Sequence, residues 1–221
     1  MESMDITHSL PTIHEGSDRI LWTSPGGSFS SATAYAIHAP PGPKVGWSSL
    51  LVGTFKITRH RFILWLAILG RLSTFDRPWL QHLGTKCVLC TDDLPETHEH
   101  LFFTCSFATA CIQTIRRDIY FPWPVRDWPS AIQWAARRWR GKHVVNASFR
   151  ALLASIVYHL WHERNRRIFQ HTSRTADSIA RIVVSDIREL IICKQLPRTI
   201  SSRGLYRLRQ IPWPVEGDAS T

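Results

Sequence analysis

The stretch that decides the fold of this chain is Cys87-Val-Leu-Cys90-Thr-Asp-Asp-Leu-Pro-Glu-Thr-His-Glu-His100-Leu-Phe-Phe-Thr-Cys105. A tetrahedral zinc ion prefers sulfur and nitrogen ligands, and a Cys-x-x-Cys turn places two sulfurs on one side of the metal with little strain. The polar segment 91–99 is turn-prone and long enough to fold back over the ion. We therefore predict a zinc site whose four ligands are Cys87, Cys90, His100 and Cys105.

His98 competes with His100 as the nitrogen ligand. If this stretch is helical, His98 lies about 10.5 Å along the axis from Cys105, which is too far for two ligands of one ion. His100 is five residues from Cys105, and residues five apart do not share a face of an α-helix either. We therefore expect a helix to break before Cys105, with Thr104 at the boundary.

The alternative to a metal site is that the cysteines are buried thiols and the histidines are solvated on an acidic turn. The histidine and third cysteine at suitable spacing, next to the apolar residues 101–103, favour zinc. Four protein ligands leave no open coordination position, so we expect one structural Zn²⁺ per chain. Cys111 is the reserve ligand, and Cys193 is expected in the core.

The composition is that of a folded protein with an uneven charge. The 221 residues are 44% hydrophobic and include 10 Trp and 10 Phe, enough for a core. Residues 1–115 hold 8 Lys and Arg against 9 Asp and Glu, whereas residues 116–221 hold 19 against 8. The halves therefore carry −1 and +11, which favours a polyanionic partner on the C-terminal half over a merely solvated surface.

Apolar residues at helical spacing predict a mainly α fold. The expected helices cover residues 32–37, 59–72, 106–119, 130–140, 146–170 and 175–193. Ser106 and Asn146 are the expected N-caps of two of them. No strongly alternating strand longer than five residues is present, so we expect a zinc-stapled helical domain, a basic helical C-terminal part, and little or no sheet.

The motifs together resemble the reverse transcriptase zinc-binding domain family of plant non-LTR retrotransposons. The resemblance covers about residues 18–170. The segments that carry it are Asp18-Arg-Ile-Leu-Trp22, Gly27-Ser-Phe-Ser30, Phe62-Ile-Leu-Trp65, Gly70-Arg-Leu-Ser-Thr74, the four proposed ligands with His100-Leu-Phe-Phe103, and Leu160-Trp-His-Glu-Arg-Asn-Arg-Arg-Ile-Phe169. It implies a non-catalytic, zinc-stabilised accessory module cut off from a retrotransposon polyprotein, with a reverse transcriptase as a possible partner.

Nucleic acid, either RNA or single-stranded DNA, is the expected partner. Basic side chains would neutralise phosphates, and an exposed aromatic ring would stack on unpaired bases. The candidate residues are Arg137, Arg138, Trp139, Arg140, Lys142, Arg164, Arg166 and Arg167. Trp139 has an equally weighted alternative as a core residue, and the whole surface could instead bind an acidic protein partner as an interaction scaffold.

An enzyme is not expected. No Tyr-x-Asp-Asp pair of a polymerase is present, and Asp92-Asp93 falls inside the zinc loop. A ribonuclease H fold needs dispersed carboxylates on strands, and a His-Cys nuclease lacks a convincing second metal constellation in this sequence.

The expected organisation is a disordered tail (1–17), a zinc-binding domain (18–121), a basic helical extension (122–200) and a loose tail (201–221). The longest apolar run has eight residues, so no membrane helix is expected. Five cysteines without a hydrophobic leader indicate a reducing, intracellular location, either nuclear or cytoplasmic.

Overall fold

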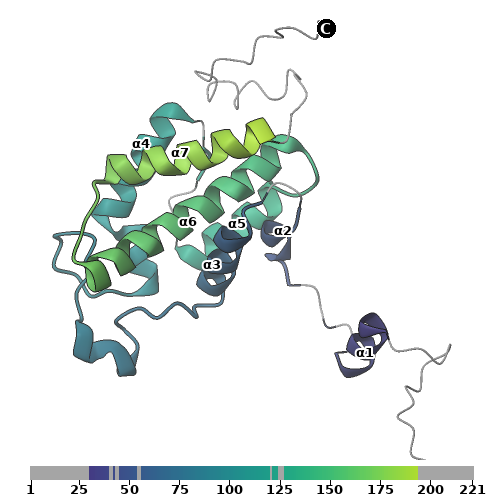
Figure 1. Cartoon of the computed structure of the whole chain (residues 1–221), viewed down its shortest axis with the longest axis horizontal. Coiled ribbons are helices and arrows are strands. Elements are labelled where there is room, and N and C mark those ends of the chain that lie inside the picture. Colours follow the sequence, from purple (N-terminus) through teal and green to yellow (C-terminus); the bar gives the residue numbers. More distant parts are fainter. Residues whose placement is uncertain are drawn as a thin grey trace, which may run out of the picture. The chain divides into compact units, whose positions relative to one another are not determined.

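Figure 1 shows the protein as a computed structural model, which describes residues 30–39, 42, 45–53, 56–119, 121–123 and 127–193. By compactness the chain divides into residues 1–44 and residues 45–221. The first unit contains helix α1, Ser31–His38. The expected tails at 1–17 and 201–221, and the expected opening at 18–29, lie outside the described residues.

The second unit is helical, as the sequence predicts. Within its described part, extended pairing is limited to one isolated antiparallel bridge between Lys86 and Pro95. The elements are α2 (Ser48–Leu51), α3 (Thr58–Ile68), the 3-10 helix η2 (Pro78–Leu83), the π-helical turn η3 (His100–Thr104), α4 (Ser106–Asp118), α5 (Trp128–Arg138), α6 (Val144–Gln170) and α7 (Ala176–Cys193).

Helix α6 is the centre of this unit. It packs against α3 and α7, and α4 packs against α7 (Figure 1). Apolar residues on several sides of α6 are buried, among them Leu152, Val157 and Leu160, and they share one core with Leu64 of α3 and Val183 of α7. The expected zinc-binding domain (18–121) and the expected basic extension (122–200) therefore contribute to one common hydrophobic core.

By length and composition alone, α6 could also cross a membrane. Its 27 residues include a sufficiently apolar window, but 67% of that window is buried inside the protein. A helix that is apolar all round is found in the core of a helical protein as well as in a membrane. Its packing between α3 and α7 accounts for the apolar composition.

The helix starts differ from the predicted caps. Helix α4 begins at Ser106, but Ser106 is itself held by Asp92: its amide donates to Asp92 Oδ2 (3.3 Å) and its hydroxyl to Oδ1 (3.0 Å). Helix α6 begins at Val144, and the Asn146 amide donates to the Arg140 carbonyl (2.7 Å) instead of capping the helix. Both predicted caps were wrong, because partners outside the helices occupy these residues.

Candidate metal centre

The two cysteines of the Cys-x-x-Cys turn lie in a short hairpin that we call the knuckle, residues 85–96. The Cys87 amide donates to the Leu94 carbonyl (2.9 Å), and the Glu96 amide donates to the Thr85 carbonyl (2.8 Å). The chain reverses direction in the segment between Cys87 and Leu94, where Asp93 adopts the left-handed backbone region at φ 60°. The knuckle thus holds Cys87 and Cys90 on one side of a small enclosed space.

The other two candidate ligands are brought together by the π-helical turn η3. The Cys105 amide donates to the His100 carbonyl (2.8 Å), a hydrogen bond that spans five residues. Cys105 itself is extended, at φ −63° and ψ 127°, so the helix breaks before it and ends at Thr104 as predicted. The spacing of residues did not predict the π turn, which lets residues five apart face the same point.

The four side chains converge. The Sγ atoms of the three cysteines and a ring nitrogen of His100 all lie within 4.8 Å of one another. Cys87 Sγ is 3.9 Å from Cys105 Sγ, and Cys90 Sγ is 3.2 Å from His100 Nε2. Zn–S bonds of about 2.3 Å place tetrahedral sulfurs roughly 3.8 Å apart, so the thiol spacing fits a zinc ion.

The surroundings of the cluster favour metal binding. His100 Nδ1 lies 3.1 Å from Thr104 Oγ1, which fixes the ring with Nε2 toward the sulfurs. A hydrogen bond from Cys105, with further ones from the backbone at Cys90 and Leu89, lowers the pKa of Cys87 to about 5, whereas the same hydrogen bond raises the pKa of Cys105 and burial raises that of Cys90. Amide groups that point at a thiolate stabilise the form of cysteine that binds metal.

Arg167 of α6 holds the knuckle from outside. Its guanidinium donates to the carbonyls of Val88 and Leu89, each at 2.9 Å, and lies over the Phe107 ring at 4.6 Å. The same side chain bonds Glu163 Oε1 at 3.0 Å. The backbone between the two knuckle cysteines is therefore positioned by a helix nearly eighty residues away.

A second tie between α6 and the knuckle is a buried ion pair. Arg164 Nε is 3.1 Å from both carboxylate oxygens of Glu96, whose Oε1 also accepts from the Phe75 amide (3.0 Å). Arg164 is 3% exposed and lies between the rings of Phe75 and Trp161. Hydrogen bonds satisfy both charges, which is the condition for tolerating a buried ion pair.

The structure divides the predicted nucleic-acid residues into two groups. Arg137, Arg138, Arg140 and Lys142 are exposed at the end of α5 and in the turn that follows. Trp139 is 1% exposed and packs against the rings of Phe121, Trp123, Trp134 and Phe149. Trp139 is therefore a core residue, which was the alternative considered from the sequence, and its ring is not available to stack on a base.

The predicted nucleic-acid arginines of α6 have partners within the protein. Arg164 belongs to the ion pair with Glu96, and Arg166 Nε lies 3.5 Å from Glu163 Oε2. Arg167 is committed to Glu163 and to the knuckle backbone. We therefore withdraw these three arginines from the proposed nucleic-acid surface, because their charge is used inside the protein.

Three further residues bear on the choice of ligands and on the expected core. The reserve ligand Cys111 is buried in the core outside the cluster, where burial raises its thiol pKa to about 12. Cys193, expected in the core, is exposed. His98 is outside the cluster and packs against Phe102 and Trp128, which supports His100 as the nitrogen ligand.

Sequence analysis missed a buried cationic residue, Arg150. Its Nη1 donates to the carbonyls of Trp139 (2.5 Å) and Gly141 (3.0 Å), which fixes the turn that carries Arg140 and Lys142. Its position could have been noticed in the sequence, because Arg150 is a charged residue within an apolar helix that begins shortly after Gly141.

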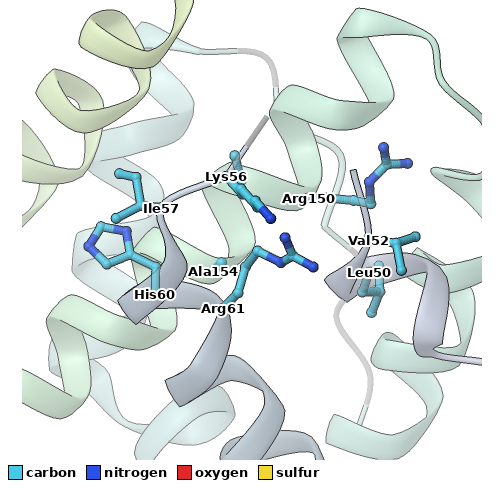
Figure 2. A pocket seen from close by; sticks show the side chains of 9 residues that line it. Leu50, Val52, Lys56, Ile57, His60, Arg61, Arg150 and Ala154 are labelled. Atoms are coloured by element: carbon cyan, nitrogen blue, oxygen red, sulfur yellow. The ribbon is translucent and has the colours of Figure 1, made fainter. Parts of the chain in front are cut away.

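A small pocket lies beside this region. Its cavity volume is about 10 Å³, close to the space that one water molecule needs. Three basic side chains line it, from Lys56, Arg61 and Arg150 (Figure 2). His60 also lines it, and the lining contains no carboxylate and no thiol.

A helical fold with a buried three-cysteine, one-histidine cluster defines a zinc-binding module. Residues 29–111 match the family described as zinc-binding in reverse transcriptase. This match includes all four cluster residues and confirms, for that segment, the resemblance to a reverse transcriptase zinc-binding domain. No curated protein and no solved structure matches the chain.

Proposed function

We propose that this protein is a non-catalytic accessory module that binds RNA or single-stranded DNA and derives from a retrotransposon reverse transcriptase polyprotein. It acts inside the cell, in the nucleus or cytoplasm, without a membrane, and a reverse transcriptase is a possible partner. One structural Zn²⁺ in the Cys87, Cys90, His100 and Cys105 cluster stabilises it. Three thiolates and one imidazole form a closed donor set that zinc prefers.

The observation that supports nucleic-acid binding is the basic turn, which we define as residues 137–142. Four of its six residues are cationic and exposed: Arg137, Arg138, Arg140 and Lys142. Over the described residues, none of the four forms an ion pair with a carboxylate. Exposed cations that lie close together in the chain and have no carboxylate partner are suited to neutralising successive phosphates.

The test is the salt dependence of binding to a labelled single-stranded RNA or DNA. The parent protein is compared with a variant in which the four cations of the basic turn are changed to Gln. If all four contact phosphates, the log–log slope of affinity against salt falls by about 3 units, since each contact contributes roughly 0.7 on single strands. Parent-like binding by this variant would overturn the assignment of the surface.

A matched control removes the same charge elsewhere. Lys56, Arg71, Arg174 and Arg181 are exposed and lie outside the basic turn, so their Gln variant should keep most of the slope. If both variants lose the slope equally, the attraction is a property of the overall charge and no specific surface is involved.

The burial of Trp139 favours a second candidate function. A basic surface without an exposed stacking ring also fits an interaction scaffold for an acidic protein segment. A poly-glutamate peptide distinguishes the two: it should compete only weakly with RNA if the surface fits phosphates spaced along a strand. If the peptide binds more tightly than RNA, the interaction scaffold becomes the better-supported function.

Zinc content is tested separately by metal analysis after purification under reducing conditions. We expect tightly bound zinc that Cys90→Ser removes, because a closed site contributes directly to folding. A folded parent protein without metal would rule out the zinc assignment, whatever the outcome of the RNA measurements.

A further inference from the structure

A second group of metal-ligating side chains lies in the helical core, apart from the cysteine cluster. It consists of His60 from α3, His159 from α6 and Asp186 from α7, which we call the three-helix triad. Their ligand atoms all lie within 4.8 Å of one another. His159 Nε2 is 2.6 Å and His60 Nε2 is 3.8 Å from the same carboxylate oxygen, Asp186 Oδ2.

His60 is the unexplained member of this triad. Its side chain is 1% exposed, and neither of its ring nitrogens has a hydrogen-bond partner. Buried polar atoms without partners are rare in native proteins, and each one calls for an explanation such as an ion. The ring is stacked on Tyr158 at 4.2 Å between centroids, which fixes its plane.

The direction of the His60 ring also fits a ligand. In Figure 2 it turns away from the guanidinium groups of Arg61 and Arg150. It faces His159 and Asp186 instead. The guanidinium of Arg59 lies over the Tyr158 ring at 5.6 Å.

We propose that the three-helix triad is a second metal site, one that takes a divalent first-row transition ion such as Zn²⁺ with an open fourth position. Two imidazoles and one carboxylate are a donor set that zinc accepts, and three protein ligands leave room for water. Tetrahedral ligand atoms at these bond lengths lie roughly 3.4 Å apart. The observed 2.6 and 3.8 Å each need to change by less than about 1 Å.

The carboxylate has the support that a ligand needs. The Ser155 hydroxyl donates to Asp186 Oδ2 at 2.8 Å, which orients the carboxylate toward the histidines. The side chains of His159 and Asp186 are slightly exposed, so an ion can enter from their side. Because its ligands come from three different helices, the ion would fasten α3 and α7 to α6.

The test is a titration with Co²⁺ of protein whose cysteine cluster already holds zinc. We expect a second equivalent of metal with intense d–d absorption and no thiolate charge-transfer band, since the triad has no sulfur. No uptake beyond the first ion, or uptake with only the weak spectrum of octahedral surface cobalt, would overturn the proposal. The parent titration decides this even if a variant fails to fold.

Variants then assign the ligands. His60→Gln and His159→Gln should each weaken cobalt binding by at least about 100-fold, and Ser155→Ala by about 10-fold, as expected for a group that orients a ligand. The matched control is His162→Gln, an exposed histidine of the same helix outside the triad, which should change affinity less than about 2-fold. Unchanged binding in folded His60 and His159 variants would also overturn the site. Neither result depends on nucleic-acid binding.

Discussion

His98 and His100 are two residues apart, and the structure gives them different roles. His100 lies in the metal cluster, whereas His98 packs between Phe102 and Trp128. We expect His100→Ala to lose most of the bound zinc. His98→Ala should keep its zinc but lower the free energy of unfolding by about 1–3 kcal/mol, because it leaves a cavity in the core. Zinc content and thermal unfolding of both variants check this, and the opposite ranking of zinc loss would identify His98 as the ligand.

The two cysteines outside the cluster should differ in reactivity. Cys193 is exposed, whereas Cys111 is buried and its pKa is raised to about 12, so it carries almost no thiolate at neutral pH. In the folded, metal-loaded protein we expect a thiol reagent to modify Cys193 rapidly and Cys111 only on unfolding. Mass spectrometry of the labelled peptides measures this, and Cys193→Ser should remove the rapid phase.

At the scale of elements, α6 controls the geometry of the knuckle. Arg167 of α6 donates to the two carbonyls that lie between the knuckle cysteines. We expect Arg167→Gln to speed zinc release to a chelator by about 10- to 100-fold, the usual effect of losing a group that supports metal ligands. Arg166→Gln is the matched control, because Arg166 pairs with Glu163, and the hydrogen bonds from α6 to Val88 and Leu89 come from Arg167. Equal release rates in the two variants would contradict this role.

At the scale of the molecule, the segment matched by the family should not fold alone. Residues 29–111 include α3 and the first six of the thirteen residues of α4; α3 packs against α6, and α4 packs against α7. A fragment that ends at residue 121 would expose those faces and would lose Arg164 as the partner of buried Glu96. We expect it to unfold without cooperativity and to bind zinc more weakly than the full chain. Calorimetry and zinc competition measure both, and a cooperative transition in the fragment would show that the zinc domain is independent.

The sequence by itself determined the helices and the four residues of the candidate metal cluster. Apolar spacing placed the helices within a few residues of their observed bounds, as in residues 146–170 against Val144–Gln170. The four ligands follow from local spacing, because Cys87 and Cys90 share one turn, and His100 and Cys105 share the next segment. Such features depend on neighbours in the chain, which a sequence displays directly.

Only the tertiary structure decided how the charges and the remaining histidines are used. Arg164 and Arg137 look equally basic in the sequence, but one is buried against Glu96 and the other is exposed. His60, His159 and Asp186 come from three helices and become neighbours only when α3, α6 and α7 pack together. Contacts such as His60 with Asp186 join residues more than a hundred positions apart in the chain. They depend on how whole helices pack, which the spacing of residues within one segment does not show.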